Sequence, residues 1–255
     1  MGRMAVVCYR AKGGAREALH RLCASHYARL YVLGHVTRRL PVYLSARDGS
    51  VVQVLEWKSQ DEIDAAAKHP AVLELAELSE LVPLTALPEA DEQLALFEPA
   101  PFAVELPPFH KVYNHVQVNE RISTSGAITA EVIEQMAREG YGTVINLLPD
   151  THQHALANEA ELVHRHALAY HHIPVDFSKP SRASYEAFEQ ALNGVASDQR
   201  VYVHCAANMR VSAYLAIYGR KRLAWSTARA TRLIAEVWEP NEIWRKFIDE
   251  QLTTG

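Results

Sequence analysis

The residues best suited to chemistry are a cysteine and an arginine separated by four residues, Cys205 and Arg210. The apolar run Arg200–His204, typical of a buried strand, leads directly into them, and a mainly apolar helical stretch follows to about Leu223. A short loop in this position gathers its amides and a helix N-terminus around one point, which binds tetrahedral anions. Those amides and the guanidinium favour the thiolate, the nucleophilic form of cysteine. The spacing therefore predicts a nucleophilic sulfur beside a bound oxyanion.

Strands and helices alternate through the second half of the chain, which predicts a mostly parallel α/β sheet around this loop. The expected strands are 112–118, 122–124, 143–148, 169–175 and 200–204. The expected helices are 129–139, 156–166, 184–195 and a last one that begins at Pro240 and carries the core residues Trp244 and Phe247, with Trp238 before it.

Several spaced stretches of this half resemble the cysteine-dependent protein phosphatase superfamily, particularly its dual-specificity-like bacterial members. The stretches that carry the resemblance are 122–126 (ISTSG), 127–139, 142–147 (GTVINL), 173–176 (IPVD) and 203–210 (VHCAANMR). Together they extend over residues 110–250. The resemblance implies hydrolysis of small-molecule or protein phosphomonoesters through a phosphocysteine, without a metal or another cofactor.

The resemblance gives a role to each matching residue. Cys205 would be the nucleophile, Arg210 would hold the phosphate, and Asp176 would be the general acid. His204 would orient the loop. Ser212 lies near the hydroxyl that assists the thiolate in relatives, although it follows Arg210 by two residues rather than one. The loop amides that would bind phosphoryl oxygens belong to Ala206, Ala207, Asn208 and Met209.

One departure from the phosphatase pattern is the length of the loop. The phosphatase signature has five residues between cysteine and arginine, whereas four lie between Cys205 and Arg210. A shorter loop is a narrower cradle, and this length is that of rhodanese-type sulfurtransferases. The loop has no glycine, and Asn208 is the residue best able to adopt a left-handed conformation there. Two alternatives therefore stay open: sulfur transfer from a sulfane sulfur donor through a Cys205 persulfide, and a non-catalytic module that only binds an anion.

Structural roles are the alternatives for the individual residues. Cys205 could be a buried core thiol, and Arg210 a surface charge. Asp176 could be a turn or N-cap aspartate, in which case Asp150 is the second candidate for the general acid. The other cysteines, Cys8 and Cys23, lie in an apolar strand and helix and are expected to be inert.

The first half of the chain follows a different order: strand, helix, two strands, helix and strand. The expected strands are 4–9, 36–45, 51–57 and 81–87, with an Asp48-Gly49 turn between the second and the third. The expected helices are 15–33, which Gly34 ends, and 59–79, which Ser59 caps and Pro70 divides.

This order resembles the antibiotic biosynthesis monooxygenase-like family over residues 3–97, with Glu56-Trp57-Lys58-Ser59 entering a helix and His69-Pro70 within it. The resemblance implies a ferredoxin-like α+β domain, of the dimeric α+β barrel type, that forms a homodimer through its sheet. Some relatives are cofactor-free oxygenases and others degrade haem. His26, Trp57 and His69 are the candidate pocket residues, with packing or capping as their structural alternative.

The proline-rich stretch from Pro83 to Pro108 separates the two halves. Proline donates no ladder hydrogen bond and cannot continue a helix, so an edge strand followed by a linker is expected. We therefore predict a ferredoxin-like domain at 1–98, a linker at 99–109 and a phosphatase-like α/β domain with a central, mostly parallel sheet at 110–255.

Composition limits the partners and the compartment. The 255 residues carry a net charge of −4 and no polybasic block, so nucleic acid is not an expected partner. No run of 18 apolar residues predicts a membrane span, and three cysteines favour a reducing, cytoplasmic location. Thirteen histidines raise the possibility of a zinc site, but their i, i+2 spacings place neighbouring pairs on different faces of a helix, so no metal is expected.

Overall fold

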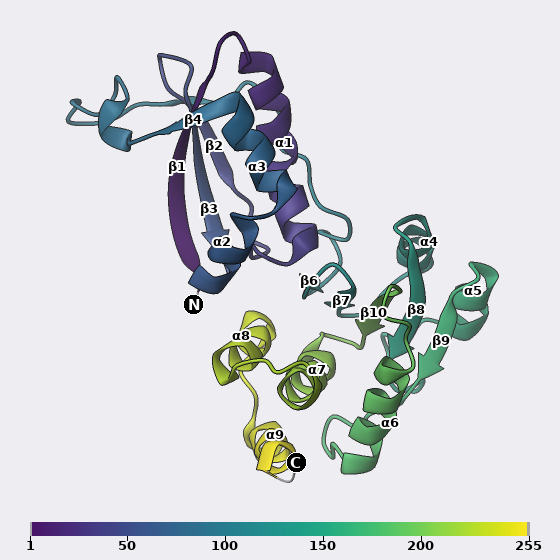
Figure 1. The fold of residues 1–255 in the computed structure, drawn as a ribbon. Helices are drawn as coiled ribbons and strands as arrows, with labels where there is room; N and C mark the ends of the chain where they lie inside the picture. The colour runs from purple at the N-terminus through teal and green to yellow at the C-terminus, as the bar shows by residue number, and fades with distance from the viewer. Residues whose placement is uncertain (1, 254–255) are drawn as a thin grey trace. The chain divides into compact units, whose positions relative to one another are not determined.

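The computed structural model describes residues 2–253 and divides into two compact units, Met1–His110 (unit 1) and Lys111–Gly255 (unit 2). Figure 1 shows a separate sheet with its own helices in each unit. The chain is therefore a mixed α/β protein with two sheets, one in each unit.

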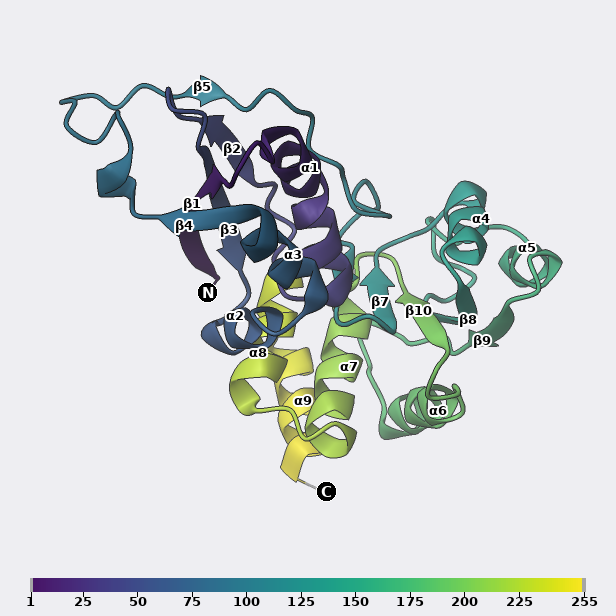
Figure 2. The same cartoon turned by 45° about the horizontal axis from the view of Figure 1, so that its top comes forward.

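Unit 1 is built on an antiparallel sheet in the order β4-β1-β3-β2-β5. Figure 2 shows α1, α2 and α3 on one face of this sheet. The elements are β1 (Arg3–Ala11), α1 (Arg16–Leu33), β2 (Val42–Ser45), β3 (Val51–Trp57), α2 (Gln60–Ala66), α3 (Pro70–Leu78), β4 (Ser79–Val82), the 3-10 turn η1 (Leu84–Ala86) and β5 (Glu98–Pro99). The assignment of this unit to the ferredoxin-like class stays a prediction.

Local chemistry sets the ends of these elements. Gly34 ends α1 at a φ of 86°, a conformation that costs glycine no steric strain, and Ser59 Oγ accepts a hydrogen bond from the Glu62 N–H (3.3 Å) at the start of α2. Two expected strands are shorter than predicted. Pro41 precedes β2 and Pro83 follows β4, and because proline has no N–H to donate, the ladder does not extend through either position.

Residues 99–109, expected to form a linker, belong to unit 1 and pack against its other elements. Glu98 and Pro99 pair with β2, and the N–H of Glu105 donates to the carbonyl of Ala24 (2.8 Å). The Phe102 ring meets the Tyr43 ring edge-on at 5.3 Å between centroids. The Phe102 side chain is partly buried against the cluster that contains Tyr43. This contact holds the segment in place, and composition alone does not predict it.

Unit 2 has a sheet in the order β6-β7-β10-β8-β9, with β7, β10, β8 and β9 parallel and β6 antiparallel at the edge. Figure 2 shows α4 and α5 on one face and α6 and α7 on the other. The elements are β6 (Val116–Gln117), β7 (Ile122–Ser125), α4 (Ala130–Arg138), β8 (Tyr141–Asn146), α5 (Glu159–Arg165), β9 (Ala169–His172), α6 (Arg182–Asn193), β10 (Arg200–His204), α7 (Met209–Arg222), α8 (Thr227–Val237) and α9 (Glu242–Thr253). The expected strands 112–118 and 169–175 are both shorter than predicted.

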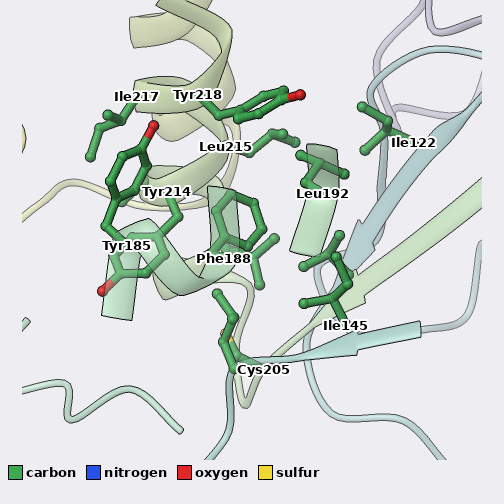
Figure 3. Close-up of a cluster of buried hydrophobic side chains, with 14 of the residues drawn as sticks. Ile122, Ile145, Tyr185, Phe188, Leu192, Cys205, Tyr214, Leu215, Ile217 and Tyr218 are labelled. Atoms are coloured by element: carbon green, nitrogen blue, oxygen red, sulfur yellow. The ribbon is translucent and has the colours of Figure 1, made fainter. Parts of the chain in front are cut away.

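The core of unit 2 surrounds the central strand β10 and the first turns of α7. Figure 3 shows Tyr185, Phe188 and Tyr214 in a cluster of buried side chains, with Cys205 at the end of the strand. Trp244 and Phe247 of α9 belong to the same cluster, as the sequence predicts. Across residues 2–253, the helices are too short or too polar to cross a membrane.

Candidate active site

The segment from Cys205 to Arg210 connects the carboxyl end of β10 to α7. The Cys205 N–H donates to the Ser125 carbonyl of β7 (3.3 Å), and the Leu147 N–H after β8 donates to the His204 carbonyl (2.9 Å). Asn208 adopts the predicted left-handed conformation, with a φ of 63°, and precedes the first residue of α7. The central strand is thus held on both sides where the loop begins.

Hydrogen bonds from a neighbouring segment hold the loop carbonyls on one side. The Ala127 N–H donates to the Ala206 carbonyl (3.0 Å), and Asn114 Nδ2 donates to the Ala207 carbonyl (3.1 Å). Asn208 Nδ2 returns a bond to the Asn114 carbonyl (2.7 Å). Gly126 permits this approach, because a Cβ there would lie 2.8 Å from the Ala206 oxygen.

This arrangement directs amide donors to the opposite side of the loop. A trans peptide points its N–H away from its C=O, so the Ala207 N–H faces away from Ala127. The first N–H groups of α7, which begins at Met209, have no intrahelical acceptor. Together they form the anion-binding end of a 14-residue helix.

The Cys205 side chain has no exposed area and contacts the hydrophobic cluster of unit 2. Its sulfur therefore lies at the base of the loop rather than on the surface. A reactant has to approach it from the side of the loop amides, because the other side is filled by the apolar side chains seen in Figure 3. This burial also keeps bulk water from the sulfur.

Arg210 is held in place by the segment after β9. The side chain is only 7% exposed, its Nε donates to the Val175 carbonyl (2.8 Å), and Cζ lies 5.2 Å from the centre of the Phe177 ring. The Phe177 carbonyl in turn accepts a bond from Trp244 Nε1 (2.9 Å). A guanidinium held at Nε keeps its two terminal NH₂ groups for an oxyanion.

Asp176 is exposed and forms a local turn. Its Oδ1 accepts bonds from the Ser178 N–H (2.8 Å) and the Ser178 hydroxyl (2.7 Å). These bonds, with a smaller contribution from the Arg210 charge, lower the pKa of Asp176. The ionised form is favoured, which suits proton acceptance, whereas donation of a proton requires acidic solution. Asp150, the second candidate, is also exposed and lies 3.6 Å from His172 Nε2.

Ser212 occupies a buried position in the first turn of α7. Its hydroxyl donates to the Met209 carbonyl (3.1 Å) and accepts from Trp238 Nε1 (3.2 Å). The first bond lies within α7, and the second ties the helix to Trp238, which follows α8. In this arrangement the hydroxyl supports the helix end that carries the loop.

The partner of His204 has no signal in the sequence. His204 Nε2 lies 2.8 Å from Glu159 Oε1, and both side chains are at most 5% exposed. Glu159 Oε2 accepts from Asn146 Nδ2 (3.1 Å), which also donates to the Tyr170 hydroxyl (3.0 Å). Glu159 lies 45 positions before His204 and shows no spacing motif, so only the fold brings them together.

His152 is a second residue near the site whose position there could not be predicted from the sequence. Burial and the positive charge of Arg210 lower the pKa of His152. The same charge contributes to the lowered pKa of Asp176. The loops after β8 and β9 therefore both approach the guanidinium.

The candidate pocket residues of unit 1 lie in three different surroundings. His26 is buried and its Nδ1 lies 3.2 Å from Gln53 Nε2, and burial lowers its pKa to about 4. Trp57 packs in a hydrophobic cluster with Tyr27. His69 borders an open apolar hollow of about 360 Å³ beside α1. Within residues 2–253, no three histidine, cysteine or acidic side chains are grouped to hold a metal ion.

Comparison with known proteins places unit 2 beside phosphatase-like proteins. Residues 115–221 match the family described as beta-lactamase hydrolase-like protein, phosphatase-like domain. A beta-lactamase hydrolase-like protein from Xylella fastidiosa is 34% identical over 98 residues, which are 37% of this chain and 22% of that protein. The chain thus spans about a fifth of the length of this curated relative.

Solved structures give a similar result. A putative phosphatase (DUF442) from Shewanella putrefaciens CN-32 is 26% identical with a TM-score of 0.53, covering 58% of this chain and 96% of that one. TpbA from P. aeruginosa, solved in complex with pTyr, is 13% identical with a TM-score of 0.46, covering 61% of this chain and 96% of that one. The family match and the Shewanella structure support a phosphatase function for unit 2.

Proposed function

We propose that unit 2 hydrolyses phosphomonoesters, with Cys205 as the nucleophile. The observation that carries the proposal is the loop itself: its carbonyls are bound by Ala127 and Asn114, so that amides and Arg210 remain for an oxyanion at the end of β10. The match of residues 115–221 to a phosphatase-like family supports the same chemistry. The substrate belongs to the small-molecule or protein phosphoesters, with an aryl phosphate as the simplest probe.

The proposed reaction has two steps. The Cys205 thiolate attacks phosphorus, the phosphorus–oxygen bond to the leaving group breaks, and Asp176 gives its proton to the departing oxygen. Water then attacks the phosphocysteine, Asp176 takes a proton from it, and the sulfur–phosphorus bond breaks to release phosphate and the thiolate. Arg210 and the loop amides stabilise the charge on the phosphoryl oxygens in both steps.

Hydrolysis of p-nitrophenyl phosphate by Cys205→Ser tests this proposal. We expect loss of turnover, because serine at this position lacks the stable anion. Cys23→Ser is the matched control, since Cys23 is equally buried in unit 1 and burial raises its thiol pKa to about 12. Full activity in the Cys205 variant would refute the nucleophile.

The four-residue spacing between Cys205 and Arg210 favours one second candidate, sulfur transfer. In that reaction the thiolate would take sulfane sulfur from thiosulfate, release sulfite and pass the sulfur from its persulfide to a thiol acceptor. Parallel assays with p-nitrophenyl phosphate and thiosulfate separate the two. Cys205-dependent transfer of sulfur without phosphate release would replace the first proposal.

For unit 1 we propose a ferredoxin-like domain that forms a homodimer through its sheet. Val6, Val54 and Val42 lie in one row across three strands, and Val6 and Val42 are about half exposed (49% and 51%). A second copy of the sheet is the proposed occupant. Sedimentation of Val6→Lys should show monomer where the native chain is dimeric, while Ile243→Lys on α9 keeps the native state. A monomeric native chain would refute the proposal.

A further inference from the structure

The buried pair formed by Glu159 and His204 lies directly behind the nucleophile. His204 is the last residue of β10 and precedes Cys205, and Glu159 is the first residue of α5. The two side chains are 5% and 1% exposed and 2.8 Å apart. A carboxyl group at this depth needs hydrogen-bond partners, which Asn146 and His204 provide.

The ring of His204 has one engaged and one free nitrogen. Nε2 lies 2.8 Å from Glu159 Oε1, whereas Nδ1 is buried and has no hydrogen-bond partner among the described residues. Glu159 is therefore the side chain that fixes the orientation of this ring at the end of β10.

We propose that Glu159 is a positioning residue that acts through His204 to favour the thiolate of Cys205. The inference rests on the proposed function, since it specifies how the nucleophile of that site is activated. Glu159 touches neither substrate nor sulfur. It holds the imidazole in one orientation, while Arg210 and the loop amides supply the positive field.

Other titratable groups surround the Glu159–His204 pair and the Cys205 thiol. None of them is substituted in the variants of the test. They are Asp150 and His152 after β8, Tyr170 and His172 of β9, Asp176 after β9, and Arg210 of α7. Burial is the main cause of the raised pKa of Tyr170, with the Glu159 charge adding to it. A change confined to Glu159 or His204 therefore reports on the pair.

The test measures the alkylation rate of Cys205 by iodoacetamide from pH 5 to pH 9, with peptide mass spectrometry to separate the three cysteines. Burial raises the pKa of both Cys8 and Cys23, which makes them slow at neutral pH. Glu159→Gln should slow alkylation of Cys205 at pH 6.5 about fivefold and move its profile to higher pH. Glu161→Gln, an exposed neighbour on α5, should match the native chain.

A double-mutant cycle identifies the route of the effect. His204→Gln should slow alkylation as Glu159→Gln does, and the double variant should be no slower than either single one, because both act through one imidazole.

The outcomes separate this inference from the proposed function. Unchanged or faster alkylation in Glu159→Gln would overturn the positioning role and leave the nucleophile intact. If Cys205 in the native chain reacts no faster than Cys23 at pH 6.5, both the nucleophile and the positioning role are refuted.

Discussion

Each unit contains a buried histidine within a polar network, His26 in unit 1 and His204 in unit 2, and the two networks differ in the charge of the partner. His26 in unit 1 meets the neutral amide of Gln53, which also contacts Tyr9 and Tyr43. His204 in unit 2 meets the carboxylate of Glu159. Beside a neutral partner, burial determines the protonation state of the ring, so the His26 imidazole stays uncharged at neutral pH. A carboxylate partner fixes the orientation of the ring beside the nucleophile. Burial alone therefore does not show whether a histidine is structural or chemical; its partner does.

Substitution of Arg210 should have the largest effect on the activity of unit 2. Arg210→Lys removes the paired terminal donors and the contact with Phe177, so kcat/KM for p-nitrophenyl phosphate should fall about 100- to 1,000-fold. Arg182→Lys, on the exposed side of α6, is the control and should retain native kinetics. Equal activity of the two variants would show that the Arg210 guanidinium has no role in the reaction.

Acidification should destabilise unit 1 through His26. Its pKa is lowered from 6.5 to about 4 in the folded chain, first by burial and then by the Arg29 charge. The unfolded chain binds more protons between these values, so stability is complete above about pH 6.5 and falls as the pH approaches 4, by up to about 3 kcal/mol. Urea unfolding of unit 1 at several pH values measures this.

His26→Gln should flatten that pH dependence and leave phosphate ester hydrolysis unchanged at pH 6. A drop in turnover of His26→Gln at pH 6 would contradict a purely structural role for this histidine.

Gly126→Ala should loosen the loop. The added Cβ would lie 2.8 Å from the Ala206 oxygen and 2.9 Å from the Tyr113 ring, so the backbone has to shift, at a cost of about 1–3 kcal/mol. We expect a lower melting temperature of unit 2 and a higher KM for the phosphate ester. Gly194→Ala is the control, because its nearest neighbour is 3.4 Å away. Equal behaviour of the two variants would show that the Ala127–Ala206 contact does not shape the cradle.

The smallest expected effect concerns Asp176. Ser178→Ala removes one of the two donors that lower the pKa of this carboxyl, so the pKa should rise toward its ordinary value. If Asp176 is the general acid, the alkaline limb of kcat against pH moves to higher pH. An unmoved limb in Ser178→Ala, together with native kinetics of Asp176→Asn, would exclude the aspartate from proton transfer.

The elements that local chemistry determines could be predicted from the sequence. The C-terminal glycine of α1, the Ser59 cap and the strand–loop–helix around Cys205 follow from residue type and periodicity. Left-handed Asn208 was also expected from its side chain. Where proline interrupts a ladder, at Pro41 and Pro83, the apolar pattern extended the strands too far.

Features that depend on tertiary contacts could not be predicted. Glu159 resembles any acidic residue in the first turn of a helix, and only the folded sheet brings it to His204. The same holds for the Asn114 side chain, which binds the Ala207 carbonyl from 93 residues away. The resemblance identified the nucleophile and the arginine, but not the residues that hold them.

Acid quenching of the reaction with p-nitrophenyl phosphate, followed by peptide mass spectrometry, shows whether Cys205 carries the phosphoryl group during turnover. In Asp176→Asn, where breakdown of the intermediate is slowed, the peptide containing Cys205 should gain the mass of one phosphoryl group, and Cys205→Ser should show no such thiol adduct. Rapid phosphate release by Cys205→Ser, or a phosphoryl group on a different residue, would contradict the account.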